Sequence, residues 1–123
     1  MKQRPTPGAI RDGMRRVETA TRELVLAIEQ GDQAVIATVL AERGRHIQEL
    51  GPHFATSRRS GGIDDDLRTA TRALIAAGDE ALVALQHSRA ATGSMLARLA
   101  REAVAIRAYG DDLPAANNLN RSG

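Results

Sequence analysis

Apolar residues recur along the first part of the chain at alternating spacings of four and three, beginning at Ile10. That spacing places them on one face of a helix that packs along another helix. The pattern is interrupted near residue 31 and then resumes as far as Leu50. The seam of this first arm, residues 9–50, consists of Ile10, Met14, Val17, Thr21, Leu24, Ile28, Ile36, Leu40, Arg43, Ile47 and Leu50.

A second arm, residues 64–109, begins with the acidic triplet Asp64, Asp65 and Asp66. Three carboxylates in a first turn complement the helix dipole and supply a cap. A helix start explains them better than a magnesium or calcium site, because no loop with further oxygen ligands follows. The seam of this arm consists of Leu67, Leu74, Ala81, Leu85, Thr92, Leu96, Leu99, Ala103 and Ile106.

Each arm contains a Gly-Asp pair, at Gly31-Asp32 and at Gly78-Asp79. Glycine weakens a helix and aspartate is a good N-cap, so both pairs predict a hinge. The pattern does not decide whether the helices break there or only bend.

The arms should end at glycine and proline. Gly51-Pro52 predicts the end of the first arm and a loop over residues 51–63. Residues 1–8 and 111–123 are predicted to be flexible tails flanking a single helical domain, residues 9–110.

These elements predict an all-α fold: an elongated antiparallel helical hairpin, or an up-and-down bundle if both arms fold at their hinges. At about 1.5 Å per helical residue, Gly31 and Gly78 would lie near the same level of an antiparallel pair. A simple hairpin leaves part of each seam exposed unless further helices or a second chain cover it. The pattern therefore favours a protein that acts through helix surfaces.

Composition narrows the possible functions. Apolar residues make up 42% of the chain but aromatic residues only 2%, so the core must be aliphatic. The absence of cysteine excludes disulfides and thiolate chemistry. A net charge of +2 from interspersed charges disfavours nucleic-acid binding. No apolar run has the length of a signal peptide core or a membrane span, so we expect a cytoplasmic protein without membrane insertion.

No constellation of catalytic or metal-binding residues is recognisable. His46, His53 and His87 lack the spacing of a helical zinc motif. The serines lack a nucleophile elbow, and no glycine-rich phosphate loop follows a strand. We therefore expect no enzymatic activity, no cofactor and no metal site.

One combination of features resembles a known family. An apolar helix from Leu24, then Gly31-Asp32, then a helix with Leu40-Ala41-Glu42-Arg43 leading to Leu50, is similar to flagellar export chaperones of the FlgN/FliT type. The second arm, which ends in Ala108-Tyr109-Gly110, is also similar. The resemblance covers about residues 17–123.

The resemblance implies a cytosolic chaperone that binds the helical ends of flagellar export substrates and hands them to the export apparatus. A client's amphipathic helix would lie in a groove of the chaperone. Under this interpretation the partner-binding residues are seam positions of the second arm, namely Leu85, Thr92, Leu96, Leu99 and Ile106. The alternative for each of them is a place in the intramolecular core.

Two other functions stay open. The chain could be a structural module that self-associates into a four-helix homodimer. It could also be a small nucleic-acid-binding regulator that uses Arg15, Arg16, Arg58 and Arg59, although aromatic stacking platforms are lacking.

Overall fold

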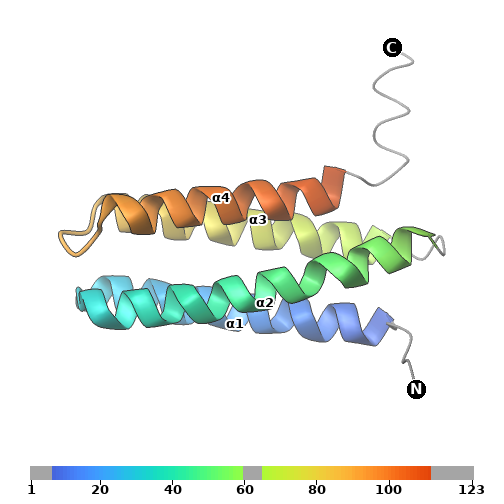
Figure 1. The fold of residues 1–123 in the computed structure, drawn as a ribbon, viewed down its shortest axis with the longest axis horizontal. Helices are drawn as coiled ribbons and strands as arrows, with labels where there is room; N and C mark the ends of the chain where they lie inside the picture. Colours follow the sequence, from blue (N-terminus) through green and yellow to red (C-terminus); the bar gives the residue numbers. More distant parts are fainter. Residues whose placement is uncertain (1–6, 60–64, 112–123) are drawn as a thin grey trace, which may run out of the picture.

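The computed structural model describes residues 7–59 and 65–111, and this part of the chain forms four helices. They are α1 (Pro7–Gln30), α2 (Gln33–Arg59), α3 (Asp65–Gln86) and α4 (Gly93–Asp111). Figure 1 shows them side by side, running alternately in opposite directions along the long axis. This confirms the all-α fold, and of the two predicted forms it is the up-and-down bundle. Most of the two predicted tails, residues 1–6 and 112–123, lies outside the described residues.

The four helices form two stacked hairpins. Helix α1 packs on α2 and α3 packs on α4, while α1 also packs on α3 and α2 on α4. Helices α1 and α3 therefore run parallel as neighbours, and α2 lies diagonally opposite α3 (Figure 1). Because each arm folds back on itself, its seam is covered within the same chain.

The first hairpin turns at Gly31, where the predicted hinge is a complete break. Gly31 has a φ of 73°, a left-handed conformation that glycine adopts without steric penalty. Its amide donates to the carbonyls of Ala27 and Ile28, which closes the end of α1. A carboxylate oxygen of Asp32 then accepts hydrogen bonds from the amides of Ala34 and Val35, at 3.0 and 3.2 Å, and caps α2.

The second hairpin turns at residues 87–92 and not at the predicted hinge Gly78-Asp79. Helix α3 runs through Gly78 without a break. The turn is made by hydroxyl groups instead: Ser88 accepts from the amide of Ala90, and Thr92 accepts from the amide of Met95 and caps α4. The two turns lie at the same end of the bundle, where Gln33 Nε2 donates to the carbonyl of Ala90 at 3.0 Å.

Helix α2 continues through Gly51-Pro52 to Arg59, so the predicted loop at 51–63 begins too early. Proline removes one backbone hydrogen bond, and Figure 1 shows α2 bending over its final part. Tertiary packing overrides this local signal. Phe54 is 1% exposed, and its ring stacks on that of Tyr109 with centroids 5.3 Å apart.

Apart from Phe54, the buried core carries no aromatic residue among the described residues, close to the aliphatic core that composition predicts, and it consists of two separate clusters. Every residue of the first predicted seam is buried, including Thr21 and Arg43. One cluster, nearer the chain termini, comprises Ile10, Met14, Val17, Ile47, Leu50, Phe54, Leu67, Leu74 and Ile106. The other, nearer the two turns, comprises Leu24, Ala27, Ile28, Ile36, Leu40, Ala81, Leu85, Met95 and Leu99.

Candidate functional site

A polar layer separates the two apolar clusters, and each helix contributes one residue to it. These residues are Thr21 of α1, Arg43 of α2, Gly78 of α3 and Glu102 of α4, and we call them the arginine layer. Arg43 is 1% exposed and is the largest of the fully buried side chains among the described residues. A charged side chain in this position requires partners, because burying an unpaired charge is strongly unfavourable.

Arg43 has partners on two other helices. Its Nε donates to Thr21 Oγ1 at 2.7 Å, and its terminal nitrogen Nη1 donates to Glu102 Oε1 at 2.8 Å. Thr21 in turn donates to the carbonyl of Val17 at 2.7 Å. The second carboxylate oxygen of Glu102 accepts from Arg98 Nε at 3.3 Å, so two arginines share this carboxylate. The layer ties α1, α2 and α4 together through charge-assisted hydrogen bonds.

The side chains of the arginine layer occupy space that is free because two neighbouring positions are glycine. A Cβ at Gly78 would lie 3.0 Å from Arg43 Nη2. A Cβ at Gly44 would lie 2.7 Å from Glu102 Oε2 and 3.0 Å from Arg98 Nη2. Gly78 therefore makes room for a guanidinium. Its neighbour Asp79 forms a two-pronged ion pair with Arg107 Nη2, at 2.8 and 3.1 Å, that holds α3 to α4.

The electrostatics of the layer follow from burial. Desolvation lowers the pKa of Arg43, and the charge and hydrogen bond of Glu102 oppose that shift. An arginine guanidinium does not lose its proton in proteins, so Arg43 stays charged. The arginine layer is therefore a buried ion pair at neutral pH.

A hollow of about 260 Å³ opens beside the layer, between α2 and α4. These two helices pack less closely than the other adjacent pairs. Long side chains fill the gap: Arg98 and Glu102 at one level, and Tyr109 near the chain termini, whose hydroxyl donates to the carbonyl of Ile47 at 3.3 Å. Burial raises the pKa of the Tyr109 hydroxyl. The contact between α2 and α4 thus combines polar side chains with the ring stack of Phe54 and Tyr109.

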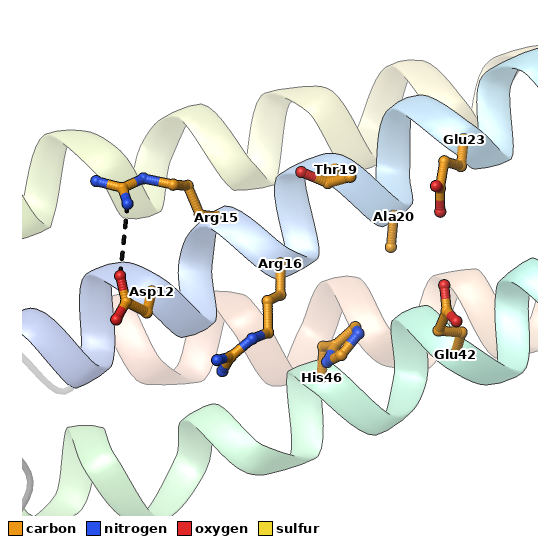
Figure 2. A pocket seen from close by; sticks show the side chains of 8 residues that line it. All are labelled: Asp12, Arg15, Arg16, Thr19, Ala20, Glu23, Glu42 and His46. Atoms are coloured by element: carbon orange, nitrogen blue, oxygen red, sulfur yellow. Dashed lines mark hydrogen bonds and ion pairs between the residues drawn. The ribbon is translucent and has the colours of Figure 1, made fainter.

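A larger hollow, of about 400 Å³, lies between α1 and α2 and is shown in Figure 2. Its walls mix charges of both signs. Glu23 and Glu42 face each other across it, and Arg16 and His46 come from opposite walls. Arg15 forms an ion pair with Asp12 at 3.4 Å. Such a balanced lining gives no preference for an anion or a cation.

Of the five predicted partner-binding residues, three are buried in the bundle and two are half-buried at its surface. Leu85, Leu99 and Ile106 are at most 2% exposed and pack inside the bundle. Leu96 is half-buried against the cluster near the turns, and half-buried Thr92 caps α4. The bundle brings them to α4 and the adjoining face of α3, but in its closed form the three buried residues are out of a partner's reach.

The other candidate residues do not converge. His53 lies on α2 with His46, not in a loop, and His87 begins the turn after α3. Within residues 7–59 and 65–111, no three histidine or acidic side chains gather as metal ligands. Over the same residues, no helix has both the length and the hydropathy needed to cross a membrane. Arg58 and Arg59 belong to α2, but their side chains lie outside the description.

Sequence reasoning missed Glu102 because two of the four seam positions that it placed on α4 were one residue away. The predicted seam contained Leu96, Leu99, Ala103 and Ile106, whereas the buried face carries Met95, Leu99, Glu102 and Ile106. Both patterns alternate spacings of three and four, and alanine is the more usual core residue. Arg43 in an otherwise apolar seam was the available signal, because a buried arginine predicts a buried carboxylate.

Comparison with known proteins adds no family to this description. No family model, no curated protein and no solved structure matches the chain.

Proposed function

We propose that this protein is a chaperone of flagellar or related protein export, which holds an amphipathic helix of its client in the place that α4 occupies in the closed bundle. The proposal joins the resemblance of residues 24–50 to export chaperones with the way in which α4 is attached. In this conformation the bundle needs no partner to cover its seams. A client would therefore gain access by replacing one of its helices.

The observation that carries the proposal is that α4 contributes few apolar side chains to the buried core. Among residues 93–109 this helix buries three apolar side chains, Met95, Leu99 and Ile106, and its fourth buried residue there is the charged Glu102. It is also the shortest of the four helices, with 19 residues. Elements that bury little apolar surface open locally at a lower free energy than the rest of a fold. A client helix with a better apolar face would compete for the same place.

The predicted partner-binding residues then take different roles. Leu85 belongs to α3 and would line the place that α4 leaves. Leu96, Leu99 and Ile106 belong to α4 and mark the face that the client imitates, and Thr92 caps the start of that helix.

A crosslinking experiment tests this proposal directly. Gln48 and Arg101 are both exposed and line the hollow between α2 and α4. The chain has no cysteine, so a bismaleimide would bridge only the pair Gln48→Cys and Arg101→Cys. The matched control bridges Thr19→Cys and Glu42→Cys, exposed residues that line the hollow between α1 and α2. Binding is measured by anisotropy with labelled terminal helices of the flagellar subunits encoded in the same genome.

We expect the wild type and the bridged control to bind one of these helices, and the chain with α4 locked to α2 to bind it at least tenfold more weakly. Equal binding by the locked chain would show that α4 stays in place when a client binds. Binding to none of the flagellar subunits would remove the assignment to export.

A further inference from the structure

The arginine layer sets a chemical condition on any helix that takes the place of α4. Arg43 is on α2, and its Nε is held by Thr21 on α1, so both stay behind when α4 leaves. The carboxylate of Glu102 leaves with α4. The replacement helix would then cover a buried guanidinium that has lost its counter-charge.

The space for a carboxylate also stays behind. Gly44 belongs to α2, and any side chain on it would overlap the position of Glu102 Oε2, which would lie 2.7 Å from an added Cβ. The three-helix remainder thus keeps a cation, a threonine hydroxyl that orients it, and a gap beside both. An apolar side chain in that gap would leave Arg43 charged and unpaired, which is the unfavourable way to break a buried ion pair.

We propose, building on the function proposed above, that the partner's helix must present a glutamate or aspartate to Arg43. The acidic residue should stand within the spacing that α4 shows for Met95, Leu99, Glu102 and Ile106: apolar, apolar four residues later, acidic after three more, and apolar after a further four. The apolar positions give affinity, and the acidic position selects partners and fixes their register along the bundle. A lysine or arginine at that position excludes a helix by like-charge repulsion.

The test uses the complete chain, opened at one point. A site for a specific protease is inserted between Arg89 and Ala90, in the turn that joins α3 to α4. After cleavage both pieces stay in the sample, and labelled peptides spanning residues 93–111 compete with the resident α4. One peptide has the native sequence and the other carries E102L. The second host chain is the Arg43→Met/Glu102→Leu double variant, which has no buried charge to leave unpaired.

We expect the native peptide to enter the Arg43 chain at least tenfold more tightly than the E102L peptide, although the latter is more apolar. In the double-variant host the order should reverse. Entry of the E102L peptide into the Arg43 chain with equal or higher affinity would overturn the acidic requirement and leave the proposed function standing. Entry of neither peptide would overturn both, because the place of α4 would then not be exchangeable.

Sedimentation of the uncleaved chain tests whether the incoming helix comes from a second copy of this protein. A dimer in sedimentation that is lost on Glu102→Leu would identify the incoming helix as α4 of a second copy. That result would overturn the assignment to a separate partner. A monomer at all concentrations supports it.

Discussion

Arg43 and Glu102 form a buried ion pair whose two members depend on each other. Replacing Glu102 with leucine leaves the guanidinium buried and unpaired, and we expect this to lower the free energy of unfolding by about 3–5 kcal/mol. The Arg43→Met/Glu102→Leu double variant should unfold within about 1 kcal/mol of the wild type or be more stable, because a well-packed apolar pair replaces the charges without a desolvation penalty. Urea denaturation followed by circular dichroism measures both. A single variant as stable as the wild type would show that water compensates for the lost carboxylate.

Tyr109 gives the molecule a sensitivity to alkaline pH. Its pKa is raised in the folded state by burial, so folding favours the protonated hydroxyl. Stability is therefore unaffected below the ordinary pKa of 10.0 and falls as the pH rises above it, since the unfolded chain then releases the proton more readily. We expect the melting temperature to drop as the pH rises above 10.0, and that of Tyr109→Phe to drop less over the same range. Equal losses in the two proteins would assign the effect to other groups.

At the scale of the elements, the sequence predicts a turn where the local signal is strong. Asp32 is predicted as a cap because aspartate after glycine is such a signal, whereas the turn made by Ser88 and the cap made by Thr92 stand among alanines and were not predicted. Gly78 and Gly51 misled the prediction for a common reason. Each lies where a side chain from another helix approaches, Arg43 in one case and Tyr109 in the other. Such contacts join residues far apart in the chain, so no local pattern reports them.

Replacing Gly44 or Gly93 with alanine distinguishes the effect of helix propensity from the effect of packing, because only Gly44 is crowded by side chains of another helix. Gly93 begins α4 with open space around its Cβ direction, so Gly93→Ala should stabilise the protein by about 0.5–1 kcal/mol through the lower entropy of the unfolded chain. Gly44→Ala gains the same propensity but places a methyl group 2.7 Å from Glu102 Oε2. We expect a net loss of about 1–3 kcal/mol from this overpacking, together with weaker attachment of α4. Thermal unfolding of both variants is the measurement, and a stabilised Gly44→Ala would mean that Glu102 moves aside freely.

For the whole molecule, the fold class followed from the seams, because alternating spacings of three and four specify helices packed along one another. The choice between hairpin and bundle did not follow, since it depends on a complete break at Gly31 and on a turn at residues 87–92. Of the two charged residues in the candidate site, one could be predicted from the sequence. Arg43 stood out in its seam, but Glu102 is 59 residues away along the chain, and the bundle alone brings them together.

The packing of the bundle predicts that its helices do not open together. Helix α4 buries three apolar side chains among residues 93–109 and packs less closely on α2 than the other adjacent helices pack on each other, whereas α1 packs against both α2 and α3 along a long apolar seam. Backbone amides in the middle of α4 should therefore exchange with deuterium at least tenfold faster than those in the middle of α1, through a local opening that leaves α1 in place.

Variants at the edge of α4 make this prediction specific. Arg107→Ala removes the exposed ion pair to Asp79 and should speed exchange in α4 severalfold, because such a pair contributes up to about 1 kcal/mol. Bridging Gln48→Cys to Arg101→Cys should slow exchange in α4 to the rate of α1, and the Thr19→Cys/Glu42→Cys bridge should leave α4 unchanged. Exchange measured by mass spectrometry on peptic fragments distinguishes these cases. If α1 and α4 exchange at one common rate in the wild type, the bundle opens as a single cooperative unit, and α4 has no separate motion with which to admit a partner.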